Sequence, residues 1–444
     1  MELELHGVTG RMVQPDGYSF DINWLCLGLV FLVLPIVELT GLITGVPSSI
    51  DIGMSIAFEF LAVILTAKVG NLRPYLGAVP MHKVAICWFV SSAAAILYLA
   101  FSKHQMSGFL MDFCTSLLPL LGVAALIRIL TNRSTKYENL PSQVAGVGAL
   151  ILGMTSVSGM LSLTISSLPN VYDPVLYRFE HILGISFEVP FYHLFSARII
   201  GPSTYQAIYN YIGLAIILAA RSEFVYSPNR LQAGLVLRFL VVAAIGYGLY
   251  YLMPVLDPAG FFGPLFPYRL PEVQSVATHV VKAPLGEWAN VARNTMPSLH
   301  AAWAILGFLA LRHSPVWHKI LGVLLILAIL IVTLGAGQHY AVDWIAALPL
   351  VLLARGISAV SLPIRHKARQ IAIFAGAALL VLWVLAVRVT PESLKYPVLI
   401  QLLGLASVVL PLWLELRLAR AEDRTARHDD EILAVSAEMP EPAT

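Results

Sequence analysis

Charged residues are scarce in this sequence. Asp, Glu, Lys and Arg make up 12% of its 444 residues, whereas an ordinary soluble domain is about a quarter charged. Hydrophobic residues reach 58% and the mean hydropathy is +0.78. A soluble fold of this length has too little interior to bury so much apolar surface. The composition therefore excludes disorder except at the ends, and predicts an all-α polytopic membrane protein, since a backbone in lipid must satisfy its own hydrogen bonds.

Cysteine and an excess charge of one sign are also lacking. The three cysteines, Cys26, Cys87 and Cys114, fall in apolar runs and form no CxxC pair, which argues against a disulfide framework or a zinc knuckle. Basic residues number 28 against 26 acidic ones, for a formal net charge of +2. This balance gives no support for a nucleic-acid partner.

Long apolar runs separated by polar loops predict about 12 transmembrane helices. The predicted spans are Ile22–Gly45, Ile52–Ala67, Val84–Phe101, Phe109–Ile127, Val144–Ile165, Tyr205–Ala220, Leu231–Met253, Ser298–Leu311, Ile320–Leu334, Ala341–Ala354, Ile371–Val387 and Tyr396–Leu416. The runs from Ser298 and Ala341 are short for a full span, so we expect their ends to lie below the membrane surface, shielded by protein.

Basic residues predict the orientation. Most loop Lys and Arg residues fall on one side of these spans, and the positive-inside rule makes that side cytoplasmic. Both termini are then cytoplasmic, and the loops 166–204, 254–297 and 335–340 face the other side. The predicted organisation is a cytoplasmic N-terminus (1–21), a four-helix membrane region (22–140), a central region (141–358), two further helices (359–416) and a largely disordered cytoplasmic tail (417–444).

The first chemistry-bearing motif is Arg293-Asn294-Thr295-Met296-Pro297-Ser298-Leu299-His300, directly before an apolar helix. Asn294 or Thr295 suits a helix cap, and Pro297 suits a first helical turn. The first-turn amides are then unpaired, and such a helix end attracts an anion such as phosphate. Arg293 lies where a guanidinium could clamp that anion in a bidentate manner.

The second motif is Gly335-Ala336-Gly337-Gln338-His339-Tyr340-Ala341-Val342-Asp343. His339 and Asp343 are four residues apart, so they share one face of a helix. A carboxylate so placed can hold one imidazole nitrogen and leave the other as a nucleophile or base. Both motifs are predicted on the same side of the membrane. We therefore expect the two histidines, the carboxylate and the anion-binding helix end to meet at one recessed position.

Pro297-Ser298-Leu299-His300 followed by His339-x-x-x-Asp343 resembles the second and third motifs of the type 2 phosphatidic acid phosphatase (PAP2) superfamily. Leu299 and Tyr340 are most similar to the inositolphosphotransferase branch, which includes inositol phosphorylceramide synthase. The resemblance covers roughly 144–354 and implies a six-helix catalytic core. It also implies that His339 attacks phosphorus to form a phosphohistidine, that Asp343 orients His339, and that His300 protonates the leaving group.

Two departures from the hydrolase pattern favour transfer over hydrolysis. The first motif of the hydrolases, a Lys followed by Arg-Pro, is not found, and Thr333 stands where their third motif has an arginine. Other cations must then hold the phosphate. Arg293 is the first candidate, with Ser298 donating from the helix end. Lys282, Arg178 and Arg198, all on loops of the same side, are the next candidates.

The stretch from Tyr172 to His181 weakly resembles an acidic stretch of the transferase branch. Asp173, Glu180 and His181 could bind a polyol head group, or they could equally be solvated loop residues. Tyr340 is a further candidate for a contact to phosphate or lipid, although an interfacial tyrosine is the commoner case.

The sequence thus predicts a lipid phosphotransferase that works between a lipid phosphate donor and a hydroxyl acceptor, without a cofactor or a metal ion. A lipid phosphate phosphatase, with water as the acceptor, is the nearest alternative. A His-His-Asp metal site, an inert scaffold and a transporter are the others. The transporter would depend on the apolar-segment carboxylates Glu38, Glu59 and Asp112.

Overall fold

A computed structural model of the chain describes residues 170–185, 188–197, 233–272, 281–282, 293, 295–389 and 392–438, with scattered positions between 200 and 226. The five spans predicted before residue 170 lie outside the described residues, as do Glu38, Glu59 and Asp112. The count of about 12 helices and the six-helix core therefore stay predictions.

The described chain is mainly helical. Two short antiparallel strands pair Asn170 with Lys282 and Val171 with Val281. The elements are β1 (Asn170–Val171), α7 (Asp173–Leu183), α8 (Glu188–Ser196), α11 (Ala233–Leu252), α12 (Pro258–Phe262), η1 (Gly263–Leu265), β2 (Val281–Lys282), α13 (Leu299–Ala310), α14 (Val316–Gly335), α15 (Ala341–Ser358), α16 (Lys367–Arg388), η3 (Glu392–Lys395) and α17 (Pro397–Glu438).

Four of these helices are long and apolar enough to cross a membrane: α14, α15, α16 and the 397–428 part of α17. Helix α15 is the central one, since 78% of its apolar window is buried against 28% for α17. The side chains of α16 and α17 that remain exposed include Phe374, Leu402 and Leu405. Apolar side chains on outward faces of long helices suit a lipid environment, so the fold is that of a helical membrane protein.

Helix α17 differs from the prediction. The last span was expected to end at Leu416 and a largely disordered tail to follow, but α17 continues to Glu438. Its polar part is rich in Ala, Glu, Arg and Leu, which favour a helix. Glu422 also pairs with Arg312 and Arg355. These partners are distant in the sequence, so the local composition could not reveal them.

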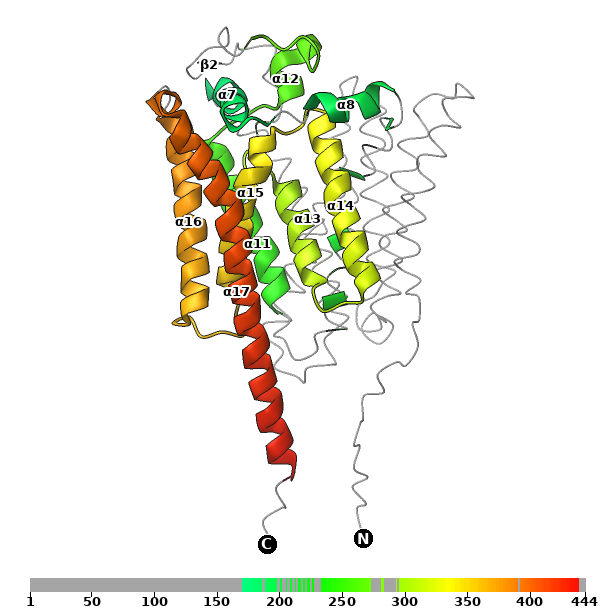
Figure 1. Cartoon of the computed structure of the whole chain (residues 1–444), viewed down its shortest axis with the longest axis vertical. Coiled ribbons are helices and arrows are strands. Elements are labelled where there is room, and N and C mark those ends of the chain that lie inside the picture. Colours follow the sequence, from blue (N-terminus) through cyan, green and yellow to red (C-terminus); the bar gives the residue numbers. More distant parts are fainter. Residues whose placement is uncertain are drawn as a thin grey trace, which may run out of the picture.

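Short helices cover one end of the bundle. Figure 1 shows α7, α8 and α12 crossing at the end where α13 and α15 begin and α14 finishes. Helix α7 begins with Asp173 and Pro174 in its first turn, and Gly184, at φ +69°, ends it in the left-handed conformation. The same end of the bundle therefore receives the starts of the two helices that carry the histidine motifs.

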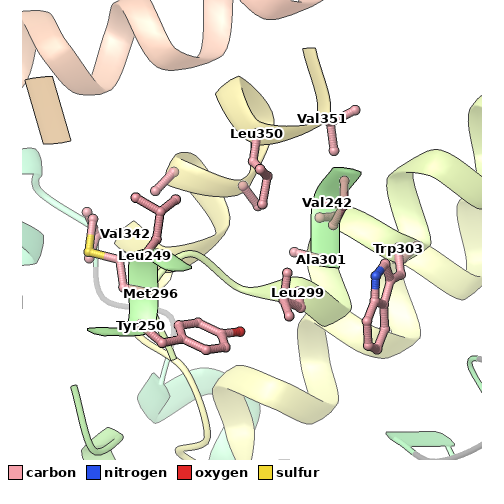
Figure 2. Close-up of a cluster of buried hydrophobic side chains, with 14 of the residues drawn as sticks. Val242, Leu249, Tyr250, Met296, Leu299, Ala301, Trp303, Val342, Leu350 and Val351 are labelled. Carbon is pink, nitrogen blue, oxygen red and sulfur yellow. The ribbon is translucent and has the colours of Figure 1, made fainter. Parts of the chain in front are cut away.

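The core lies directly beneath that end. Figure 2 shows side chains from α11, α13 and α15 converging in one buried cluster, which includes Val242, Leu299, Val342 and Leu350. Met296, which lies three residues before α13, is fully buried in the same cluster. The burial of Met296 in this cluster anchors the chain just before the first turn of α13.

Candidate active site

Helix α13 begins at the Pro-Ser-Leu-His motif. The predicted cap at Asn294 or Thr295 is wrong, because Ser298 is the N-cap and Pro297 precedes the helix. The Ser298 side chain accepts a hydrogen bond from the Ala301 amide at 3.2 Å, which satisfies one of the unpaired donors of the first turn. The Ser298 amide donates to the backbone carbonyl of Asp343 at 3.2 Å. This bond joins the start of α13 to the first turn of α15, so the two motifs are held together by backbone as well as by side chains.

The turn between α14 and α15 presents His339. The amides of Gln338 and His339 both donate to the Thr333 carbonyl, at 2.8 and 3.2 Å. Gly337 has φ +68°, and a Cβ atom there would lie 2.7 Å from the ring of Phe266. Only glycine fits this conformation and this close contact without strain. The turn is thereby fixed in one shape, and it aims His339 toward α13.

His339, Asp343 and Ser298 form a line of hydrogen bonds. His339 Nδ1 lies 3.2 Å from Asp343 Oδ2, and His339 Nε2 lies 3.2 Å from Ser298 Oγ. Asp343 Oδ2 also accepts from the Tyr340 amide at 2.9 Å. A carboxylate accepts from Nδ1–H, so the bond pattern assigns the proton to Nδ1 and leaves the Nε2 lone pair facing the start of α13.

The imidazole of His339 is buried, with 3% of its residue surface exposed. Burial lowers the pKa of His339 to about 3, against a smaller opposing effect of a hydrogen bond with the Thr295 backbone. The resting imidazole is therefore neutral near pH 7, which is the form that a nucleophile requires.

His300 faces the same position from α13. The ring centroids of His300 and His339 are 6.2 Å apart. An atom placed between the two rings can be about 3 Å from both, which is the reach of an attacking group and of a proton donor. Tyr209 covers the other side of His300, with ring centroids 3.8 Å apart. Tyr209 was not among the residues predicted from the sequence, although its spacing of four from Tyr205 would place both on one helical face.

Arg293 is a buried cation with free donors. Its residue surface is 2% exposed, and its Nε and Nη1 atoms have no hydrogen-bond partner. Burial lowers the pKa of Arg293, and the charge of Asp173 opposes this effect. An arginine remains protonated in proteins. A buried guanidinium with unbonded N–H groups suits an anionic ligand, because unsatisfied buried donors are costly.

Asp173 and Glu180 extend from α7 into the protein rather than toward solvent. Asp173 accepts from the Leu256 amide at 2.9 Å and from the Tyr340 hydroxyl at 3.1 Å. Glu180 accepts from the Ala341 amide. Burial raises the pKa of Asp173 well above its usual value, although the bonds from Leu256 and Tyr340 act in the opposite direction. These two carboxylates and Tyr340 thus hold the residues that follow His339 in the chain.

The remaining candidates are Arg178, His181, Lys282 and Arg198. Arg178 is half-buried on α7 and His181 is exposed on the same helix, with its ring packed edge-on against Tyr177. Lys282 lies in β2, and Arg198 falls outside the described residues. Within the described part of the chain, no group of three or more His, Cys, Asp or Glu side chains is placed to hold a metal ion.

Asp257 is a second site residue that was not predicted from the sequence. It caps α12, where its carboxylate accepts from the Gly260 amide. Burial raises the pKa of Asp257 to about 6, the Gly260 bond lowers it, and the charge of Asp343 adds to the increase. The Asp-Pro pair after an apolar helix could have indicated a cap, but only the fold places this carboxylate within electrostatic range of Asp343.

Comparison with known proteins finds one family. Residues 174–357 match the family model described as PAP2 superfamily. No curated protein and no solved structure gives a match. The matched segment contains both histidine motifs and Arg293. The match therefore supports assigning this segment to the PAP2 superfamily, which indicates a phosphatase or phosphotransferase.

Proposed function

We propose that this protein transfers a phosphate-linked group from a lipid donor to a hydroxyl acceptor through a phosphohistidine on His339, as the inositolphosphotransferase branch implies. One observation carries the proposal: His339 Nε2, with its ring held by Asp343, faces the capped start of α13 at 3.2 Å from Ser298 Oγ. A neutral imidazole beside a helix N-terminus combines a nucleophile with a phosphate-binding position.

The first step breaks the bond between phosphorus and the donor alcohol. His339 Nε2 attacks phosphorus, and the alcohol leaves with a proton from His300 on the opposite side of the site. The phosphoryl oxygens receive hydrogen bonds from the His300 amide in the first turn of α13 and from Arg293, whose Nε and Nη1 atoms are unbonded. The Ser298 and Ala301 amides already donate to Asp343 and Ser298. Donors fixed in place before the reaction stabilise developing charge without reorganisation.

The second step reverses the roles. An acceptor hydroxyl attacks the phosphorus of the phosphohistidine, the P–N bond breaks, and His300 takes the hydroxyl proton. The same two histidines thus serve both half-reactions. No metal ion or cofactor takes part in the scheme, because neutral imidazole supplies the nucleophile and Arg293 with the helix end supplies the electrophilic contacts.

The experiment offers a phosphorus-labelled phospholipid to the purified protein in detergent, with and without candidate alcohols. Transfer predicts label in a new phosphorylated alcohol or lipid. Label only in inorganic phosphate would assign a lipid phosphate phosphatase instead. A chelator should leave turnover unchanged, whereas a metal-dependent site would lose it. A His339→Ala variant that keeps full turnover would refute both enzyme assignments.

We also propose that the site opens on the non-cytoplasmic side, as the distribution of basic residues predicts. Tyr268, at the site end, and Ile364, at the opposite end, are both exposed. A single cysteine at either position, in a chain without Cys26, Cys87 and Cys114, can be labelled by a membrane-impermeant maleimide in intact cells. Labelling of Tyr268→Cys alone is the expected result, and labelling of Ile364→Cys alone would reverse the orientation.

A further inference from the structure

Asp257 is a carboxylate that the reaction scheme does not use. Its two flanking segments are tied to the active-site turn: the Leu256 amide donates to Asp173 at 2.9 Å, and the Ala259 amide donates to the Gly337 carbonyl at 3.0 Å. Asp173 in turn accepts from the Tyr340 hydroxyl. Asp257 is therefore anchored on both sides beside the turn that carries His339, and it keeps part of its surface exposed.

Two tyrosines lie on the His300 side of the same position. Tyr209 packs on the His300 ring at 3.8 Å between centroids, and the Tyr205 ring lies 5.5 Å from Tyr209. The charge of Asp257 acts on both phenol groups. The Asp257 carboxylate is thus within electrostatic range of both phenol groups, and the Tyr209 ring packs on the histidine that we propose to carry the proton.

A carboxylate at this position is unfavourable for phosphate binding, because two negative charges repel. It is favourable for a neutral hydroxyl group, which can donate to the carboxylate while a phenol donates or accepts. Hydrogen bonds to a charged group are about twice as strong as neutral ones. The faces of the tyrosine rings can also pack against the C–H groups of an alcohol. The chemistry of this group of side chains therefore fits a ligand with several hydroxyl groups and no phosphate of its own.

We propose that Asp257, Tyr205 and Tyr209 bind the acceptor, an uncharged polyol, and direct one of its hydroxyl groups toward His300. The inference rests on the proposed function, because it assigns a binding position to the second substrate of that reaction. It gives Asp257 no part in the attack on the donor: the carboxylate accepts a hydrogen bond from a hydroxyl that does not react.

The titration of Asp257 supports this assignment. Its pKa of about 6 leaves the carboxylate ionised, and able to accept from two hydroxyl groups, at pH 7 and above. Protonation of the Asp257 carboxylate below pH 6 replaces a hydrogen-bond acceptor by a hydrogen-bond donor. Acceptor binding should therefore weaken on acidification through pH 6 in the wild type, and it should not do so in a variant without this carboxyl group.

The test measures how much of the phosphoryl group on His339 is transferred to water and how much to an alcohol. The donor is labelled dioctanoyl phosphatidic acid in detergent micelles, and the two probes are glycerol and methanol. Methanol has a single hydroxyl group, so it can react but has no second group for Asp257 to hold. The products are separated as inorganic phosphate, glycerol phosphate and methyl phosphate, and the ratio of alcohol product to inorganic phosphate is followed as the alcohol concentration rises.

In the wild-type protein, the ratio of glycerol phosphate to inorganic phosphate should saturate as the glycerol concentration rises. The ratio of methyl phosphate to inorganic phosphate should not saturate with methanol. In Asp257→Asn the half-saturating glycerol concentration should rise roughly 10-fold or more, because a charge-assisted hydrogen bond is lost. Asparagine is as good a helix cap as aspartate, so α12 should keep its start. Tyr209→Phe keeps the ring against His300 and removes only the hydroxyl, and a rise of about three-fold is expected.

Tyr268→Phe is the matched control, because the Tyr268 hydroxyl contacts Ser196 and His193 at the surface. It should leave both ratios at their wild-type values. Equal changes of the glycerol and methanol ratios in Asp257→Asn would overturn the inference, since they would place Asp257 in the chemistry. Inorganic phosphate as the only product, with label still trapped on His339, would also overturn the inference about the acceptor, but it would not contradict the phosphohistidine intermediate. Failure of the proposed function is distinguishable, because no label would then appear on His339.

Discussion

Two buried arginines, one near each end of α15, differ in how fully their N–H groups are hydrogen-bonded. At the C-terminal end, Arg355 donates from Nε to Glu415 at 2.8 Å and from Nη2 to Glu422 at 2.7 Å. Arg312 adds bonds to Glu422 and Asp423. At the N-terminal end, next to the site, Arg293 is equally buried but has unbonded Nε and Nη1 atoms.

The difference distinguishes a cation with a structural role from one that we propose to bind the phosphate. A buried ion pair with satisfied hydrogen bonds fixes the position of the helices it joins, whatever its net contribution to stability. Here it attaches the polar part of α17 to α15 and to the turn after α13. A buried cation with free N–H groups is retained at a cost in stability, and such a cost is typical of functional sites.

The largest expected effects come from removing each arginine in turn. Arg293→Gln should lower kcat/KM for a lipid phosphate roughly 10²- to 10³-fold, as loss of one oxyanion donor does, with little change in thermal stability. Arg355→Gln should destabilise the fold by about 3–5 kcal/mol, because it takes from Glu415 its ion-pair partner and from Glu422 one of two partners. Activity per folded molecule, measured beside thermal unfolding in detergent, checks both. The comparison fails if Arg293→Gln unfolds the protein or Arg355→Gln abolishes the activity of folded molecules.

The hydrogen bond between Tyr340 and Asp173 allows a positioning role for Tyr340 to be distinguished from a contact with the head group. Tyr340→Phe removes the 3.1 Å hydrogen bond to Asp173, and we expect kcat to fall about 10-fold while the KM of the donor is unchanged. This pattern identifies a positioning residue that acts through the His339 turn. A rise in KM at constant kcat would instead support the head-group contact predicted from the sequence.

Two variants control the Tyr340 measurement. Tyr268→Phe makes the same chemical change at an exposed position and should leave kcat unchanged. The double variant Asp173→Asn, Tyr340→Phe should reduce kcat by a smaller factor than the product of the two single-variant factors, because both substitutions remove the same hydrogen bond.

Gly337 and Gly184 form a matched pair with nearly equal backbone angles. Both have positive φ, at +68° and +69°, but a Cβ atom would be 2.7 Å from Phe266 at Gly337 and would have no neighbour within 4 Å at Gly184. Alanine at Gly184 should cost about 1 kcal/mol for the backbone alone. Gly337→Ala should cost about 1–3 kcal/mol more, because it overpacks the turn, and should also lower kcat. Equal losses of thermal stability in Gly184→Ala and Gly337→Ala would show that the turn at Gly337 can adjust to the added Cβ atom.

Acid sensitivity should be the smallest effect. The pKa of His339 is about 3 in the folded chain and about 6.5 when unfolded, so its contribution to stability is complete above pH 6.5 and declines as the pH falls toward 3. The slope is up to about 1.4 kcal/mol per pH unit for one group. His339→Asn should therefore lose less melting temperature between pH 7.5 and pH 5 than the wild type.

Asp257 should act on acid stability in the opposite direction. Its folded pKa of about 6 lies above the unfolded value of about 3.9, so its contribution is complete below pH 4 and is lost as the pH rises through 6. Asp257→Asn should therefore make the acid loss steeper than in the wild type. Identical pH profiles for the wild type, His339→Asn and Asp257→Asn would show that neither group is buried as described.

Local sequence patterns predicted the parts of the site that depend on neighbours in the chain. Spacing of four residues placed Asp343 beside His339, and the apolar run from Ser298 gave the start of α13 to within one residue, although the cap was expected at Asn294 or Thr295. The apolar runs also gave the positions of α14, α15 and α16 to within a few residues. Each of these features follows from helical periodicity or capping, which operate over one or two turns.

Contacts between distant segments were beyond such patterns. The sequence left Asp173 and Glu180 equally open to a contact with a polyol and to a solvated loop position, yet their partners include the amides of Leu256 and Ala341. Tyr209 read as part of an apolar span, yet it packs on His300. A hydrogen-bond or ring partner some 80 to 170 positions away leaves no trace in the local spacing, because it is created only when the helices assemble.

Trapping the covalent intermediate tests the central claim most directly. Purified protein is mixed for a short time with a phosphorus-32-labelled lipid phosphate, denatured in alkaline detergent and digested. Label that survives alkali, is lost in acid and lies on the peptide containing His339, but is absent from His339→Gln, is the predicted result. Turnover of the donor by wild-type protein without any such label, or full turnover by His339→Gln, would contradict the account.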